Sequence, residues 1–219
     1  MKITDRLRRD ADYIWRRIFE HPFVVELYSG ILPMDKFIPY ILEDYNYLIG
    51  AIRNFSIMVS RAESVDVMKE LVEIVRLEAE SEVKGYGEFL VSLGYSLEDA
   101  AQIEPGPMNV AYENFLLITS SFKTVAEALA AVLPCFWSYH EIAVFYQERL
   151  PSNPNQVYVD WASVYVSDEY VTLLNKLKGL VDSLGQNFDY QKLKEVFIQG
   201  SRYEYMYWDA VYNRDGWPV

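Results

Sequence analysis

Three reactive residues of the chain occupy positions where a helix would normally place an apolar residue: Asp44, Cys135 and Glu204. A thiolate can add to an electron-poor ring, and a carboxylic acid can protonate a ring nitrogen as the addition proceeds. A second carboxylate can hold an amino group of the same ring. The three side chains together therefore suit addition–elimination on a heteroaromatic substrate.

Both carboxylates interrupt an apolar helical stripe. The stripe around Asp44 steps through positions 37, 41, 48, 51, 55 and 58, and Tyr47 lies on the same side. Glu204 interrupts a second stripe, through positions 193, 197, 200, 207 or 208, and 211. Because a buried carboxylate is costly unless something pairs with it, both positions indicate function. The aromatic residues around Glu204 are expected to raise its pKa and to fit it for proton transfer.

Cys135 lies in the apolar segment Leu133-Pro134-Cys135-Phe136-Trp137. Pro134 removes one backbone hydrogen bond from the predicted helix and is expected to kink it. A kink beside a thiol can turn its sulfur into a cavity, and Tyr139 follows one turn later.

Each of the three residues also has a purely structural explanation. A lone cysteine in a helix, such as Cys135, usually serves as a small core hydrophobe. Asp44 could pair with Arg53 or Arg61, and Glu204 could lie on a solvated face if the helical phase is shifted by one residue.

The elements that position these residues are all predicted to be helices, because helix-period patterns recur and no convincing alternating strand does. Their boundaries follow capping and breaking residues, such as the Ser96–Asp99 capping box and the Pro105–Pro107 loop. We expect an all-α bundle of antiparallel helices around a central pocket, with residues 1–219 forming a single domain. The expected helices cover residues 3–19, 22–30, 34–62, 65–93, a short segment from 96, 108–121, 123–149, 154–166, 168–184 and 189–213.

Composition and charge limit the partners. The 219 residues include 20 Lys and Arg against 32 Asp and Glu, giving a net charge of −12. Nucleic-acid binding is not expected, because the one cluster of arginines, between residues 6 and 17, is interleaved with aspartates. The N-terminus has no apolar signal segment, the apolar run Ala128–Tyr139 is too short for a bilayer, and one cysteine allows no internal disulfide. We expect a soluble cytoplasmic protein without a membrane partner.

Several segments resemble the thiaminase II (TenA) family. The Leu-Pro-Cys-aromatic-Trp and Glu-Tyr-x-aromatic-Trp segments are together fairly specific, and the match spans nearly the whole chain in order. The resemblance implies a haem-oxygenase-like fold, usually assembled as a homotetramer. It also implies cofactor-free hydrolysis of aminopyrimidines salvaged from degraded thiamine, and of thiamine itself, to the hydroxymethylpyrimidine. The matching segments are residues 21–24, 30–33, 37, 43–48, 133–139 with 141, and 203–208.

The resemblance also implies a role for each site residue. Cys135 resembles the nucleophile, Glu204 the acid that protonates the ring and later helps to activate water, and Asp44 the group that binds the pyrimidine's amino edge. The sequence departs from the family at Ile31, where Thr is common, and at His140, where an aromatic or small residue is more usual. His140 could alter the pocket, and with it the substrate preference, or could simply face outward. The tyrosines that resemble substrate contacts are Tyr47, Tyr139, Tyr112 and Tyr165.

Two other classes of function stay open. The same fold hosts haem and di-iron oxygenases, which need a proximal histidine or repeated Glu-x-x-His spacing. His21 reads instead as the cap of a helix junction, and neither His21 nor His140 follows a glutamate by three residues. A non-catalytic pyrimidine-binding or regulatory protein needs no thiol beside an acid, so the pair Cys135 and Glu204 favours catalysis. Some of the 18 tyrosines could also form an oligomer interface.

Overall fold

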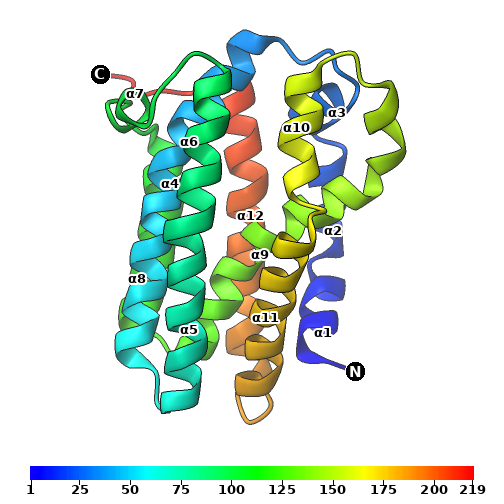
Figure 1. Ribbon diagram of the computed structural model, residues 1–219. Coiled ribbons are helices and arrows are strands. Elements are labelled where there is room, and N and C mark those ends of the chain that lie inside the picture. The colour runs from blue at the N-terminus through cyan, green and yellow to red at the C-terminus, as the bar shows by residue number, and fades with distance from the viewer. The chain divides into compact units, whose positions relative to one another are not determined.

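A computed structural model describes residues 1–219, with the exception of the side chains of residues 81 and 82. The residues it describes form helices and no strands, which confirms the predicted all-α class (Figure 1). The elements in chain order are α1 (Ile3–Asp10), α2 (Asp12–Phe19), α3 (Pro22–Tyr28), α4 (Met34–Arg61), α5 (Val65–Leu77), the π-helix η1 (Glu78–Glu82), α6 (Val83–Ser92), α7 (Leu97–Ala101), α8 (Pro107–Phe122), α9 (Val125–Phe145), the 3-10 helix η2 (Gln147–Ser152), α10 (Gln156–Val164), α11 (Asp168–Gly185) and α12 (Tyr190–Asn213).

The chain forms two compact units. The first contains Met1–Pro33 and Leu129–Asn213, and the second contains Met34–Ala128 and Arg214–Val219. The first unit therefore holds α1 to α3, most of α9 and α10 to α12. The second holds α4 to α8 and the C-terminal tail. Cys135 and Glu204 belong to the first unit, and Asp44 belongs to the second.

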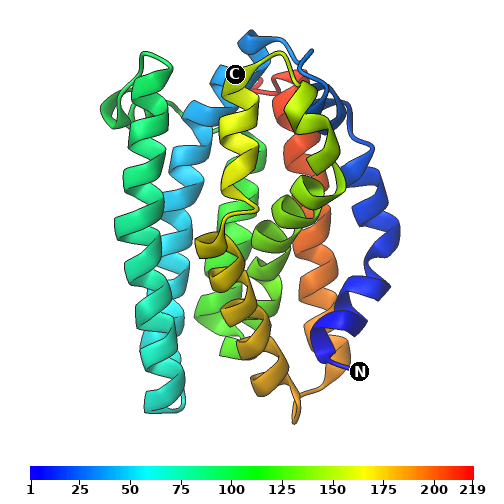
Figure 2. The same cartoon turned by 45° about the vertical axis from the view of Figure 1, so that its right-hand side comes forward.

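In the first unit, α1 and α2 lie along α12 as two separate runs of helix (Figure 2). The single helix expected over residues 3–19 is wrong, because the chain breaks at the fully buried Ala11. The break lets α1 pack on α11 and α12 while α2 packs on α12 and α3. The predicted junction at His21 is confirmed: its Nδ1 accepts a hydrogen bond from the Phe23 N–H at 3.2 Å, and Pro22 begins α3.

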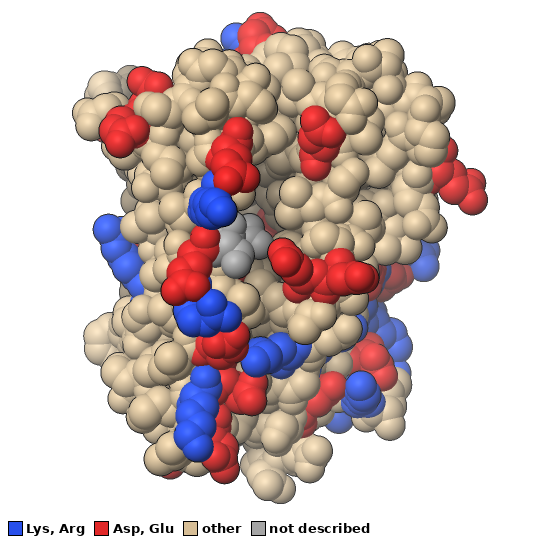
Figure 3. All heavy atoms as spheres, in the orientation of Figure 1, with Lys and Arg blue, Asp and Glu red and all other residues tan. Residues whose placement is uncertain are grey.

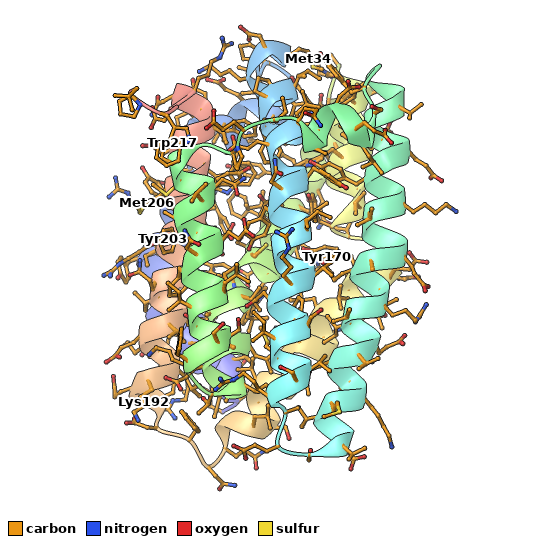
Figure 4. All side chains as sticks on the ribbon, turned by 90° about the vertical axis from the view of Figure 1, so that its left-hand side faces the viewer. Met34, Tyr170, Lys192, Tyr203, Met206 and Trp217 are labelled. Carbon is orange, nitrogen blue, oxygen red and sulfur yellow. The ribbon has the colours of Figure 1, made fainter. Side chains whose placement is uncertain are left out.

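In the second unit, α4 packs against α8 and α5. Gly50 of α4 lies against the side chain of Glu113 on α8, and Arg61 at the end of α4 donates to the Lys123 carbonyl just after α8 at 2.8 Å. The two helices therefore run in the same direction, as Figure 1 shows. The tail joins this unit through Trp217, labelled in Figure 4, whose indole N–H donates to the carbonyl of Pro105.

The helix expected over residues 65–93 is interrupted by the π-helical turn η1. A π turn adds about one residue to its turn, so the buried face of α6 is shifted in phase relative to that of α5. Figure 3 shows charges of opposite sign alternating down the exposed face of α5 and α6. Ion pairs three or four residues apart form this row, among them Arg76–Glu80 at 2.7 Å and Lys84–Glu88 at 3.8 Å. Such exposed pairs solvate the surface and contribute little to stability.

α9 extends beyond both ends of the apolar run Ala128–Tyr139 recognised in the sequence. It has 21 residues, so within the part of the chain that the structure describes it is the one helix whose length and composition would let it cross a membrane. Of its most apolar window, 72% is buried inside the structure. The core helix of a soluble protein meets the same criteria, so this property is weak evidence for a membrane span.

Candidate active site

α9 places Cys135 at its midpoint, directly after Pro134. The helix continues through the proline, whose ring removes the N–H that would otherwise bond the carbonyl of Ala130. Leu133, Phe136 and Trp137 are buried, whereas Cys135 is only half-buried. The thiol is therefore the accessible side chain within an otherwise buried stretch of α9.

α12 places Glu204 on its buried face, where the carboxylate-bearing side chain is 2% exposed. The stripe expected for this helix is buried along with it, from Leu193 to Val211. Figure 4 labels Tyr203 and Met206 on the outer side of α12, and Met206 is exposed. The helical phase therefore turns Glu204 inward.

Two contacts bring α9 and α12 together on either side of the reactive residues. A Cβ atom on Gly200 would lie 2.4 Å from the carbonyl oxygen of Ala131, so only glycine permits this approach. Two turns further on, the rings of Tyr139 and Trp208 pack with their centroids 5.1 Å apart. Because residues four apart share a helix face, the contacts bracket position 135 on α9 and position 204 on α12. The thiol and the carboxyl group therefore lie at the same level of adjoining helices.

An aromatic cluster of the first unit lies about one turn beyond this level, around Tyr139. The Tyr139 ring lies 4.9 Å from Tyr165 and 6.0 Å from Trp161, measured between centroids. Trp161 and Tyr165 are 4.8 Å apart, and Trp161 also packs against Trp208. Such a cluster presents flat apolar faces that suit an aromatic ligand. The sequence indicated Tyr139 and Tyr165, but not Trp161, although it lies four residues before Tyr165.

In the second unit, Tyr47 and Tyr112 are buried and their rings pack 5.2 Å apart. Asp44 lies at the edge of the buried face of α4 and is half-buried, whereas the stripe placed it at the centre. The buried face passes instead through Ile41 and Tyr47, because α4 packs against α5 and α8 at once. The hydroxyl of Tyr86 on α6 lies 3.4 Å from Asp44 Oδ2, a partner that the sequence did not indicate.

The arginines considered as structural partners of Asp44 make other contacts. Arg53 lies 3.6 Å from the carboxylate of Glu113, and Arg61 donates to the carbonyl oxygens of Ser121 and Lys123. These contacts hold α4 against α8. The Tyr86 hydroxyl near Asp44 also donates to the backbone carbonyl of Ile41, which holds that hydroxyl in place.

Glu43 is a further titratable group of the second unit that the sequence did not single out. Burial raises the pKa of its carboxyl group, and a hydrogen bond from the Gly106 N–H at 2.8 Å opposes that rise. The side-chain amide of Asn109 donates to the backbone carbonyl of Glu43. The contacts tie the first turns of α4 to the loop before α8, which steadies the backbone beside Asp44.

Among the described residues, no group of three or more His, Cys, Asp or Glu side chains could hold a metal ion. His21 lies with Nε2 3.5 Å from Asp209, and burial lowers its pKa while Asp209 opposes the shift. The structure confirms its interpretation as the cap of the α2–α3 junction.

The chain is similar to known proteins over nearly its whole length. Residues 8–214 match the sequence profile of the TENA/THI-4/PQQC family. The aminopyrimidine aminohydrolase of Helicobacter pylori is 31% identical over 220 residues, covering 97% of this chain and 100% of the relative. The solved TenA homologue from P. horikoshii OT3 is 45% identical, with a TM-score of 0.93 over 97% of this chain and 99% of its own.

A more distant structure fixes the fold. It is a domain of unknown function from Shewanella denitrificans OS217, described as having a heme oxygenase-like fold. It is 14% identical, with a TM-score of 0.79, and the match covers 96% of this chain and 92% of that domain. The expected haem-oxygenase-like fold is therefore confirmed.

Proposed function

The chain belongs to the TENA/THI-4/PQQC family, and on that premise we propose that it hydrolyses aminopyrimidines in thiamine salvage. The proposed substrate is 4-amino-5-aminomethyl-2-methylpyrimidine, and the products are the 5-hydroxymethyl compound and ammonia. Thiamine is the second proposed substrate and gives the same pyrimidine. A relative named aminopyrimidine aminohydrolase, 31% identical over its full length, supports this reaction. The observation that carries the proposal is the bracketing of Cys135 and Glu204 by the two α9–α12 contacts.

The proposed chemistry uses these two residues in sequence. The Cys135 thiolate adds to a ring carbon of the pyrimidine while Glu204 protonates a ring nitrogen. The electron pair that this addition places in the ring then expels ammonia from the protonated aminomethyl group and leaves an exocyclic methylene. Water adds to that methylene as the Glu204 carboxylate accepts its proton. Loss of the thiolate, with release of the ring-nitrogen proton to water, restores the aromatic ring. The buried position of Glu204 supports its role, because it keeps the carboxyl group away from bulk water.

We assign the remaining site residues to substrate binding. Asp44 is proposed to accept a hydrogen bond from the pyrimidine's amino group, and the Tyr86 hydroxyl beside it supports a fixed carboxylate orientation. Tyr47, Tyr112, Tyr139 and Tyr165 are proposed to contact the ring. Their packing in aromatic pairs and clusters supports rigid ring faces.

We also propose that the chain works without a cofactor, as a single domain in a cytoplasmic homotetramer. The match to the family profile includes parts of both compact units, which supports their acting as one domain. Light scattering on the purified protein measures the subunit number, and a dimer or monomer would contradict the assembly.

Steady-state hydrolysis tests the function directly. The wild type and Cys135→Ser are compared on the aminomethylpyrimidine and on thiamine, with ammonia and the pyrimidine product both measured. Turnover by the wild type with a loss of several orders of magnitude in Cys135→Ser is expected, because serine is a far weaker nucleophile than a thiolate. Equal turnover by both proteins would refute the cysteine mechanism. The absence of turnover by the wild type on either compound would refute the function.

A further inference from the structure

Three consecutive residues of α9 contact two other parts of the first unit, the end of α10 and α1. The Tyr139 ring packs against the ring of Tyr165, which directly follows α10. The next residue, His140, has its Nδ1 atom 2.8 Å from the backbone carbonyl oxygen of Tyr165. Glu141 accepts a hydrogen bond from Arg8 of α1 at 2.8 Å. Tyr165 is therefore held by α9 twice, through its ring and through its backbone.

The short linker between α10 and α11, residues 165–167, packs chiefly through the ring of Tyr165, which contacts Tyr139, Trp161 and Tyr170. Val164 and Val166 on either side of Tyr165 are 46% and 38% exposed. Tyr170, in the first turn of α11, is buried and its hydroxyl donates to the carbonyl of Phe136 at 3.0 Å. The linker is thus attached to α9 at two polar points, one on each side of the turn that leads from α10 to α11.

His140 gives the backbone carbonyl of Tyr165 a hydrogen-bond donor that the α10 helix cannot supply. Tyr165 is the residue after the last turn of α10, where backbone carbonyls have no helical N–H partner. A carbonyl oxygen only accepts, so Nδ1 of His140 must carry the proton in this bond. The donor belongs to the residue that follows Tyr139. The hydrogen bond therefore sets the position of the Tyr165 backbone, and with it that of the Tyr165 ring, relative to the aromatic cluster described above.

We propose that His140 is a positioning residue that fixes the Tyr165 ring for recognition of the pyrimidine. This inference rests on the proposed function and goes beyond it, because His140 does not touch the reacting atoms and takes no part in proton transfer. Its effect falls on substrate binding. The loss of one partly buried hydrogen bond then raises KM about five- to tenfold, while kcat changes by less than about twofold.

The test separates the bond from the bulk of the side chain. The amide nitrogen of Asn branches from Cγ as Nδ1 of His does, whereas that of Gln lies one bond further out. His140→Asn therefore keeps the donor in place and retains a KM within about twofold of the wild type. His140→Gln and His140→Leu remove it and show the raised KM. A merely structural role would lower the melting temperature of the three variants without this pattern in KM.

The outcomes distinguish this inference from the proposed function. A KM that rises for Gln and Leu but not for Asn supports the positioning role. Equal KM values for the three variants, or a fall in kcat alone, overturn it. If the wild type hydrolyses neither compound, the proposed function has failed. The bond itself is then judged by nitrogen-15 NMR of the two histidines, where a protected proton on Nδ1 of His140 supports it and a proton on Nε2 overturns it.

Discussion

Gly200→Ala is expected to separate the two helices that carry the proposed nucleophile and acid. The added Cβ would lie 2.4 Å from the carbonyl oxygen of Ala131 and 3.2 Å from Cγ of Pro134. A carbon and a carbonyl oxygen approach to about 3.3 Å at closest, so α12 must move away from α9 by about 0.9 Å. The first of these clashes is with backbone, which cannot be relieved by a change of rotamer. The displacement therefore reaches Cys135 and Glu204, each one helical turn from the clash.

Two opposing effects determine how much Gly200→Ala changes the free energy of unfolding. Overpacking costs about 1–3 kcal/mol, and the better helix propensity of alanine returns up to about 1 kcal/mol. We therefore expect a net loss of about 1–2 kcal/mol, or about 2–8 °C in melting temperature for a chain of this size. The activity falls further, because a misplacement of about 1 Å between reacting groups can cost about a hundredfold. The disproportion between a modest loss of stability and a large loss of kcat/KM is the diagnostic result.

Gly179→Ala is the matched control. Gly179 lies in α11 with no atom within 4 Å of the place its Cβ would take. Alanine there is expected to stabilise the protein by about 1 kcal/mol and to leave kcat/KM unchanged. Thermal unfolding and steady-state kinetics of the two variants complete the comparison. If Gly200→Ala keeps both wild-type stability and wild-type activity, the close approach of α9 and α12 is wrong, and the argument for a paired thiol and acid fails with it.

Three further predictions concern single side chains. Burial lowers the pKa of His21, so the folded state binds fewer protons than the unfolded state and stability is lost as the pH falls through the unfolded pKa of about 6.5. His21→Asn keeps a capping side chain and removes this dependence, which denaturant unfolding at pH 7.5 and pH 5 measures; an unchanged pH dependence would exclude His21 as the cause. Tyr170→Phe removes the donor to the α9 backbone and should cost about 1 kcal/mol in denaturant unfolding, whereas a neutral result would mean that the bond is not formed in solution. Tyr86→Phe removes the hydroxyl beside Asp44 and should raise KM about threefold with kcat unchanged, and a fall in kcat instead would contradict a binding role for Asp44.

The sequence predicted the helices best where it contains residues that cap or break them. Ser96 and Asp99 form the predicted capping box, and Gly94 takes the positive φ of 85° that ends the preceding helix. The break at Ala11 and the π turn η1 could not be predicted in this way. Alanine and glutamate are ordinary helix residues, and packing against neighbouring helices rather than local preference decides both irregularities.

In the candidate site, too, the sequence predicted what a single helix determines and missed what packing between helices determines. The buried position of Glu204 followed from a stripe on one helix, because that helix has a single strongly apolar face. Asp44 lies at the edge of its face because α4 packs against two partners, which a stripe on one helix does not reveal. Trp161, Tyr86 and Tyr170 were missed since each acts through a residue on another helix. The chemical roles of the seven site residues stay predictions until the variants are measured.

The order of the two units along the chain has a consequence for synthesis on the ribosome. Most of the second unit, residues 34–128, is inserted between the two segments of the first, so α1 to α3 are made long before α12, on which α2 packs. The indole of Trp15, which donates to Ser201 in the finished protein, has to wait for about 185 further residues, or about 10–40 s at ordinary elongation rates. During that interval α1 and α2 lack the surface of α12 on which they pack, while residues 34–128 of the second unit have already been made. We therefore expect loss of α12 to leave α1 and α2 without the helix on which they pack.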